Sequence, residues 1–193
     1  MKSITQHLDE LLEESNKVTT GDEKLWITRD YVKCTGCRRC EIACTLHHEG
    51  RIWPEASRIR VFMLVPGVEI PHLCAQCHDY PCVASCPVDA LLVDERTSAV
   101  RVDREKCTAC GLCITACPGK IPHIHPKNEY VVICDLCDGD PQCVKVCMEA
   151  RFDVLRAVRE KPSFSHKLFA KTPDQLTEAV AENLYGEKAT ELI

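Results

Sequence analysis

The chain has 193 residues, sixteen of them cysteine, and a formal net charge of −5. Aromatic residues make up only 5% of the chain, so a large aromatic core cannot be what organises the fold. The negative charge argues against nucleic-acid binding, and no apolar run is long enough to span a bilayer. We therefore expect a soluble protein that is organised by its thiols.

A chain this rich in cysteine is a disulfide-bonded secreted scaffold, a metal-binding protein or a redox protein. Residues 1–22 contain neither the apolar segment nor the small-residue cleavage site of a secretory signal. Disulfides do not persist in a reducing cytoplasm. We therefore expect a cytoplasmic protein whose cysteines bind metal or do redox chemistry.

The first predicted element is a helix over about residues 4–16. Ser3 and Gln6 form a capping box there, ahead of leucines at helical spacing. Two β-strands are expected next, over residues 26–32 and 58–65, because these segments are rich in β-branched or alternating apolar residues. Short helices are expected after the third cysteine of each cysteine group described below.

Further along, residues 90–93 and 99–102 flank a turn-like segment and predict a hairpin. Residues 130–133 predict another strand. A second terminal helix is expected over residues 173–185, with Gly186 as its stop signal. Both terminal helices are acidic and amphipathic, so each could dock to a partner subunit or pack back onto its own domain.

The cysteines fall into four quartets with a shared spacing, and none is left over. Three closely spaced cysteines wrap one 4Fe–4S cube, and the fourth ligates the neighbouring cluster of a pair. Structural zinc sites instead use two C-x2-C pairs that lie farther apart. The spacing therefore favours four 4Fe–4S clusters over zinc or disulfides. The quartets are Cys34/Cys37/Cys40/Cys44, Cys74/Cys77/Cys82/Cys86, Cys107/Cys110/Cys113/Cys117 and Cys134/Cys137/Cys143/Cys147.

The role of the fourth cysteine also predicts which thiols share a cluster. The inner two quartets both end in Cys-Pro, at Pro87 and Pro118, and resemble one complete two-cluster ferredoxin. The outer two quartets then pair across them, although Met148 stands where proline would follow the last cysteine. The predicted ligand sets are Cys34, Cys37, Cys40 and Cys147 (first set); Cys134, Cys137, Cys143 and Cys44 (second set); Cys74, Cys77, Cys82 and Cys117 (third set); and Cys107, Cys110, Cys113 and Cys86 (fourth set).

Other polar residues near the quartets are expected to have supporting roles. Each quartet already has four thiols, so the nearby histidines are expected to form hydrogen bonds or to be exposed. Arg38, Arg39 and Lys106 could offset cluster charge, although simple surface exposure is the simpler interpretation. The sequence contains no phosphate loop, no dinucleotide-binding fingerprint and no nucleophile–base arrangement, so no reaction site is predicted.

Four motifs carry a family resemblance: residues 31–37, 81–87, 106–113 and 134–143. In this order they resemble the four-cluster ferredoxin subunits of molybdenum or tungsten pterin enzymes, hydrogenases and carbon monoxide dehydrogenase. The resemblance covers about residues 26–155. Only five residues separate the second and third cysteines of the last quartet. This short form looks most like the small subunits of aldehyde:ferredoxin oxidoreductase-type tungsten enzymes, which include tungsten-dependent benzoyl-coenzyme A reductase.

The resemblance implies an iron–sulfur electron-transfer subunit of an anaerobic oxidoreductase complex, non-catalytic by itself. It would pass single electrons between a larger tungsten or molybdenum pterin subunit and an external carrier or further redox subunit. Carbon monoxide dehydrogenase and hydrogenase partners share the short form and remain alternatives, as does a free-standing polyferredoxin. A zinc-stabilised scaffold is the alternative from another class.

The expected fold class is α+β. Tandem bacterial-type ferredoxin modules, with short helices and hairpins packed around the clusters, would be flanked by a helix at each terminus. The expected divisions are an N-terminal segment (1–24), a four-cluster domain (25–155) with an inner two-cluster module (72–125) between the outer quartets (34–44 and 134–147), and a C-terminal extension (156–193).

Overall fold

The computed structural model describes residues 24–127, 129–159 and 168–192. The helix expected over about residues 4–16 lies outside these ranges. The described part combines short helices with four two-stranded antiparallel sheets, which makes the fold α+β. No helix in this part of the chain is both long enough and apolar enough to cross a membrane.

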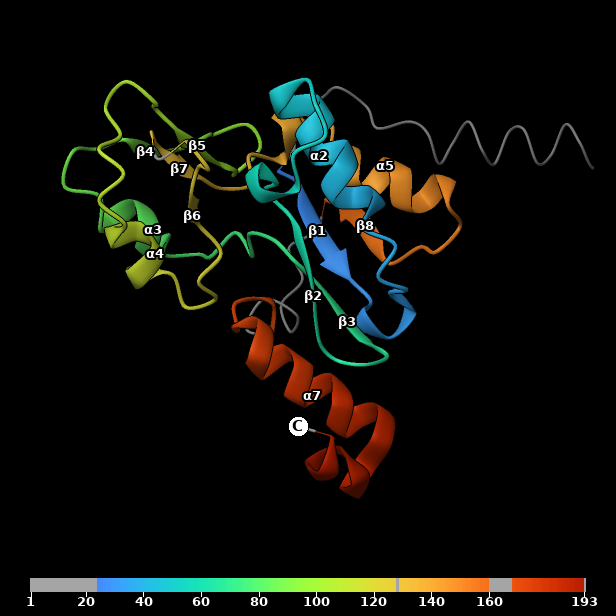
Figure 1. The fold of residues 1–193 in the computed structure, drawn as a ribbon. Helices are drawn as coiled ribbons and strands as arrows, with labels where there is room; N and C mark the ends of the chain where they lie inside the picture. The colour runs from blue at the N-terminus through green and yellow to red at the C-terminus, as the bar shows by residue number, and fades with distance from the viewer. Residues whose placement is uncertain (1–23, 128, 160–167, 193) are drawn as a thin grey trace, which may run out of the picture.

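The elements fall into three regions, each with its own buried core (Figure 1). The helices are α2 (Arg39–Glu49), α3 (Pro81–Ala84), α4 (Leu112–Ala116), α5 (Gln142–Glu149) and α7 (Pro173–Tyr185). The strands are β1 (Trp26–Arg29), β2 (Arg60–Val65), β3 (Val68–His72), β4 (Leu91–Val93), β5 (Val100–Val102), β6 (His123–Ile124), β7 (Val131–Val132) and β8 (Leu155–Val158).

The outer unit, residues 24–59 and 134–159, joins two segments that are far apart in the sequence. Strand β1 pairs with β8, with Trp26 opposite Val158 and Arg29 opposite Leu155. Helix α2 packs against α5 beside this sheet (Figure 1). The core between them contains Ile27 and Leu155 together with several cysteines, so part of the apolar interior is replaced by thiols.

The inner unit, residues 74–133, is built from neighbouring segments. Strand β4 pairs with β5 and β6 pairs with β7, while the short helices α3 and α4 pack against each other. Leu91 and Val100 lie in its core beside cysteine side chains. The hairpin predicted over residues 90–93 and 99–102 is therefore confirmed.

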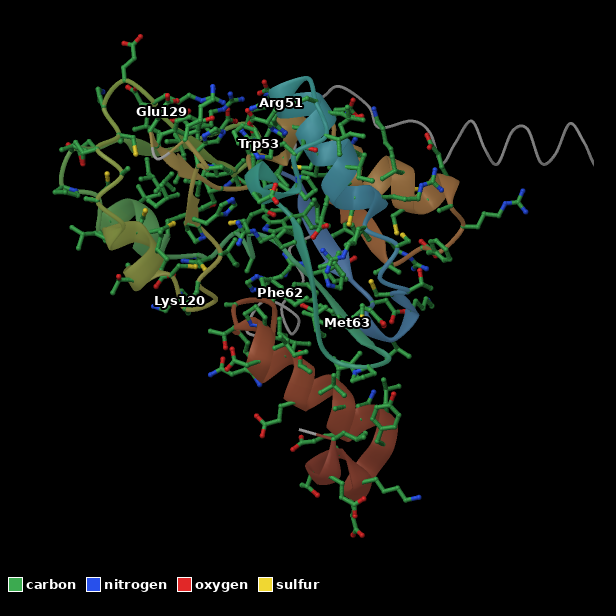
Figure 2. The ribbon with its side chains drawn as sticks, viewed as in Figure 1. Arg51, Trp53, Phe62, Met63, Lys120 and Glu129 are labelled. Atoms are coloured by element: carbon green, nitrogen blue, oxygen red, sulfur yellow. The ribbon has the colours of Figure 1, made fainter. Side chains whose placement is uncertain are left out.

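The hairpin lobe, residues 60–72 and 168–192, places α7 across the β2–β3 hairpin (Figure 1). Thr172 and Gln175 form the capping box that starts α7. Leu176 and Val180 are buried against the hairpin, so this helix packs back onto its own chain. On β2, Phe62 packs toward this core while Met63 is 53% exposed, and Figure 2 shows both side chains.

A buried polar seam joins the outer and inner units. The Arg58 guanidinium donates to the Glu49 carboxylate at 2.6 Å, and the His125 imidazole lies 3.5 Å from the same carboxylate. His125 is 2% exposed and stacks on Tyr130, with Trp53 edge-on to its ring. Figure 2 labels Trp53 near the top of the molecule.

Several strand predictions need correction. The strand expected over residues 26–32 ends at Arg29, because a 3₁₀ turn at Tyr31–Lys33 directs the chain away from the sheet toward Cys34. The strand expected over residues 58–65 begins at Arg60, and that over residues 130–133 shortens to Val131–Val132. The short helices expected after the third cysteine of each quartet are confirmed, and each begins one residue before that cysteine.

Candidate metal centres

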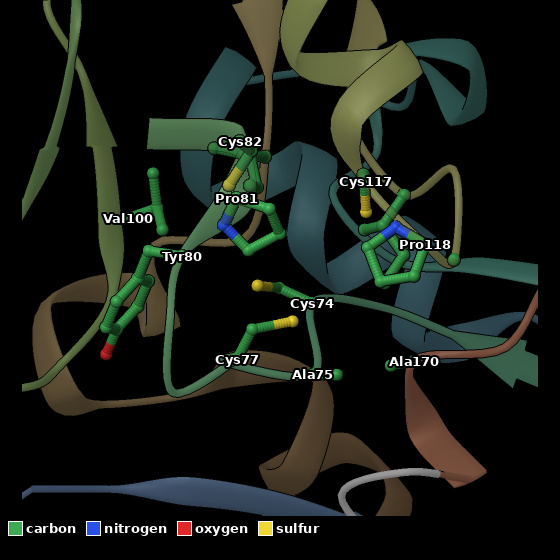
Figure 3. Close-up of a pocket in the computed structure, with 13 residues that line it drawn as sticks. Cys74, Ala75, Cys77, Tyr80, Pro81, Cys82, Val100, Cys117, Pro118 and Ala170 are labelled. Atoms are coloured by element: carbon green, nitrogen blue, oxygen red, sulfur yellow. The ribbon is translucent and has the colours of Figure 1, made fainter. Parts of the chain in front are cut away.

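All sixteen cysteines lie in the described ranges, and none forms a disulfide. The third set lines a single cavity between α3 and α4, together with Pro81, Pro118 and Ala170. Figure 3 shows its four sulfur-bearing side chains around a common space. The fourth set lines a second cavity, with Leu112 and Val131 on its walls. Four thiols around a common space are the ligand set of one 4Fe–4S cluster.

The first set is gathered by α2, α5 and the loop before α2. Burial raises the pKa of the Cys34 thiol, and the nearby Glu69, Cys37 and Cys147 raise it further. Burial likewise raises the pKa of Cys40 to about 12, with contributions from Glu41 and Cys34. Cys147, from the second segment of the outer unit, therefore lies near Cys34 and Cys37 from the first segment.

The second set is the most deeply enclosed, because all four of its cysteines are buried. Burial raises the pKa of the Cys134 and Cys143 thiols well above the usual range. The neighbouring Cys137 and Cys44 thiols raise that of Cys143 further. Thiols with such pKa values stay protonated at neutral pH unless a metal replaces the proton. The chemistry of this donor set therefore fits an iron–sulfur cluster.

Neighbouring sets also approach one another, in one order. The Cys143 thiol of the second set interacts electrostatically with Cys40 of the first. Cys134 of the second set interacts with Cys74 of the third, and Cys74 packs in the cores of both units. Cys82 of the third set interacts with Cys113 of the fourth. The four sets thus form a row that runs from the outer unit to the inner unit.

The two ends of this row reach the surface. Among the sixteen cysteines only Cys37 and Cys110 are exposed. Cys37 belongs to the first set and Cys110 to the fourth, whereas the sets between them contain no exposed cysteine.

Backbone N–H groups point at the sulfur atoms in both units. The N–H of Arg58 donates to Cys44 Sγ at 3.2 Å and that of Ala90 to Cys86 Sγ at 3.2 Å. Burial would raise the pKa of the Cys86 thiol, but N–H groups that include that of Ala90 hold it below its usual value. Such N–H groups stabilise negative charge on sulfur and raise the reduction potential of a bound cluster.

Left-handed backbone makes these tight loops possible. Helices α2, α3 and α4 each begin directly after a residue with positive φ, at Arg38, Tyr80 and Gly111. Gly36 also has a positive φ, of 64°, and the side chain of Glu69 lies against it. Glycine adopts this conformation without steric cost, which explains its place between the first two cysteines of the first quartet.

Among the supporting polar residues, His48 forms hydrogen bonds as expected of the histidines near the quartets, whereas the sequence did not indicate Arg29. His48 forms hydrogen bonds to the Cys44 carbonyl at 2.8 Å and to the Asp135 carboxylate at 3.0 Å. It thereby joins α2 to the loop that carries Cys134 and Cys137. Arg38 is 52% exposed and Lys106 57% exposed, and each pairs with a nearby carboxylate. The buried cation next to the third set is instead Arg29, whose contacts depend on three distant segments and left no signal in the sequence.

Comparison with known proteins points to the same kind of cofactor. A family described as "4Fe-4S dicluster domain" matches residues 67–155. The "aliphatic sulfonate oxidoreductase, polyferredoxin-like subunit" of Pyrococcus furiosus is 53% identical over 165 residues, which is 86% of this chain and 95% of that protein. The beta subunit of the NADH-dependent phenylglyoxylate dehydrogenase of Aromatoleum evansii is 34% identical over 124 residues, covering 63% of this chain and 28% of that protein.

Among solved structures, a chain of the active-site complex BamBC of benzoyl coenzyme A reductase has a TM-score of 0.41 and 22% sequence identity. The match covers 86% of this chain and 94% of that chain.

The clustered thiols and the matching family define an iron–sulfur protein that binds several 4Fe–4S clusters. The chain belongs to the family of polyferredoxin-like electron-transfer subunits of oxidoreductases. Its role is to carry electrons, and it is not itself the catalyst.

Proposed function

We propose that each of the four cysteine sets binds one 4Fe–4S cluster and that the sets form one path through the chain. A bound 4Fe–4S cluster accepts and releases one electron. The observation that carries the proposal is the order of the sets, with Cys74 against Cys134 at the middle and exposed Cys37 and Cys110 at the ends. The assignment of individual cysteines as ligands remains a prediction.

The protein's own residues shape this path. The thiols supply the ligands, backbone N–H groups stabilise charge on them, and buried side chains keep water from the second set. The exposed ends are where another protein could come close enough to exchange electrons. The division into a four-cluster domain over residues 25–155 and an extension over residues 156–193 belongs to this proposal.

The partner we propose is a larger catalytic subunit of the tungsten or molybdenum pterin type, at one end of the row. An external carrier or further redox subunit would bind at the other end, in the cytoplasm. The support is the short spacing in the last quartet and the name of the Pyrococcus furiosus relative, which is a subunit of an oxidoreductase. Carbon monoxide dehydrogenase or hydrogenase subunits would fit the same spacing.

A free-standing polyferredoxin is the second candidate, and one observation favours it. Helix α7 buries Leu176 and Val180 against the β2–β3 hairpin, so its apolar stripe is already covered by the chain itself. The amphipathic character of this helix therefore gives no reason to expect a permanent partner.

Metal analysis of the natively purified protein under strict anaerobiosis tests the proposal. We expect about sixteen irons and as many acid-labile sulfides per chain, four for each cluster, with tungsten or molybdenum in the same fraction. About twelve irons would mean that one set is used differently. Zinc without iron would overturn the electron-transfer role. Iron without a second metal or a second chain would favour the free-standing carrier.

A further inference from the structure

Arg29 is a buried cation at the end of β1. It is 7% exposed, and its guanidinium donates to the carbonyl oxygens of Cys74 at 2.7 Å, Leu73 at 3.0 Å and Phe169 at 3.5 Å. Its Nε atom has no hydrogen-bond partner. Among the described residues no carboxylate forms a salt bridge with it. A buried charge without a counterion is costly, so a negative group is expected nearby.

The third cysteine set adjoins Arg29 through the backbone of Cys74 and can supply that negative charge when a cluster is bound. The Cys74 carbonyl accepts the shortest bond from Arg29, and the Cys74 side chain lines the third cavity. Ala170 lines the same cavity, and the ring of the preceding residue, Phe169, stacks on the guanidinium at 4.4 Å. Figure 3 shows Cys74 and Ala170 at the edge of this space.

The surroundings leave the charge of Arg29 uncancelled. Burial raises the pKa of the nearby Tyr31 hydroxyl above its usual value, and the opposing effect of Arg29 does not reverse this. Tyr31 is therefore neutral and adds no countercharge. At the first set the situation is reversed, because the Glu69 carboxylate lies close to Cys34. The row of sets thus has a negative side chain near its outer end and a positive one at its junction.

We propose that Arg29 is a positioning residue whose charge raises the reduction potential of the cluster held by the third set. This inference rests on the ligand sets proposed above. A cube with four thiolates is anionic in both of its oxidation states, and reduction adds one more negative charge. A nearby buried cation stabilises the reduced state more than the oxidised one. Arg29 therefore favours an electron on the inner side of the Cys74–Cys134 junction.

Potentiometric titration followed by electron paramagnetic resonance, on the complete iron-loaded protein, tests this role. Arg29→Gln removes the charge and keeps a hydrogen-bond donor, whereas Arg29→Lys keeps the charge. We expect Arg29→Gln to lower the equilibrium constant for reduction of one cluster about tenfold, which lowers its reduction potential by about 59 mV for one electron. Arg29→Lys should lower this reduction potential by less than half as much as Arg29→Gln does, because it keeps the positive charge. Arg156→Gln is the matched control and should change nothing, because Arg156 lies on the neighbouring strand β8 with its side chain 54% exposed.

The assignment has its own check, because Cys77→Ser alters a ligand of the third set. The paramagnetic resonance signal whose reduction potential shifts in Arg29→Gln must be the same signal that Cys77→Ser alters. Unaltered potentials in an Arg29→Gln protein with full iron content would overturn the role of Arg29. If Arg29→Gln loses iron, Phe169→Leu is the second test, because water would then screen the guanidinium and lower the same potential. No shift in Phe169→Leu would equally overturn it.

These outcomes are separable from a failure of the proposed function. A wild-type iron content well below four clusters would contradict the ligand sets themselves. A full iron content with the same reduction potentials in wild type and Arg29→Gln would contradict only the inference about Arg29.

Discussion

In the inner unit, the segments that carry cysteine follow one another between Cys74 and Cys117, and each hairpin joins neighbouring strands. The outer unit takes its cysteines from two segments that the whole inner unit separates in the sequence. It depends on the pairing of β1 with β8 and on the packing of α2 against α5 to bring them together. The same kind of four-thiol site is thus assembled locally in one unit and by distant contacts in the other.

The difference has an energetic consequence. Closing a longer loop costs more conformational entropy, so the outer sets need more supporting contacts than the inner ones. The structure places such a contact in the outer unit, where the bond between His48 and Asp135 joins the two distant segments, while the buried pair of Arg58 with Glu49 belongs to the seam toward the inner unit. The inner unit instead has surface pairs such as that of Arg101 with Asp94.

The largest expected effect comes from removing one ligand in each unit. Cys143→Ser removes a buried thiol of the second set from α5, the helix that also carries Cys147 of the first set. We expect about eight of sixteen irons to be lost, because both outer clusters share that helix. Cys110→Ser at the exposed end should cost at most about four. Iron and sulfide analysis of the two variants checks this, and equal losses would contradict the dependence of the outer sets on each other.

The next effect concerns the seam between the units. Arg58→Met leaves the Glu49 carboxylate, whose side chain is 12% exposed, without its cation. Leaving one partner of a buried pair uncompensated costs about 3 kcal/mol or more. The matched control is Arg101→Met, which breaks a pair whose arginine is 42% exposed and should cost less than about 1 kcal/mol. The shift of the denaturation midpoint under anaerobic conditions measures both, and equal shifts would mean that the seam does not support the fold.

How much of this could be read from the sequence depends on whether the signal is local. The spacing of the quartets and the hairpin at residues 90–93 and 99–102 are local patterns, and the hairpin was predicted correctly. Strand β8 was missed because Leu155–Val158 is recognisable as a strand only beside its distant partner. Strand β3 was missed as well, since Pro71 within it weakens the strand signal.

The supporting residues show the same limit. Arg38 and Lys106 stand next to cysteines in the sequence and were considered as cations near clusters, yet both lie largely in solvent. Arg29 stands in a strand before the first quartet, and only the fold brings Leu73 and Phe169 to its guanidinium. A charge that acts through space cannot be predicted from neighbours along the chain.

A further prediction concerns the hairpin lobe, whose β3 and α7 contact the 3₁₀ turn at Tyr31–Lys33 of the outer unit. Leu176 in α7 is fully buried against the β2–β3 hairpin, whereas Leu184 in the same helix is 40% exposed. Leu176→Ala should cost about 3 kcal/mol, and Leu184→Ala should have almost no effect. Hydrogen exchange of the α7 amides in the two variants checks this. Similar protection in both would mean that α7 is held by something other than its contact with the hairpin.

The smallest effect compares two glycines in equivalent cysteine loops. Gly36 in the outer unit and Gly111 in the inner unit both have positive φ, of 64° and 77°. Alanine at either position costs about 1 kcal/mol for the left-handed backbone alone. At residue 36 the new Cβ would also lie 2.8 Å from Glu69 Cγ, whereas at residue 111 the nearest atom is 4.0 Å away. Gly36→Ala should therefore lower the denaturation midpoint more than Gly111→Ala.

A double-mutant cycle separates the two contributions to the cost at residue 36. In a Glu69→Ala background the side chain that obstructs the new Cβ is absent, so the cost of Gly36→Ala should fall to that of Gly111→Ala. If the cost does not change, the outer loop is strained by its backbone alone and Glu69 has room to move aside. The outer unit would then depend on its distant strand and helix contacts alone, and close packing around the first cysteine loop would add nothing to its stability.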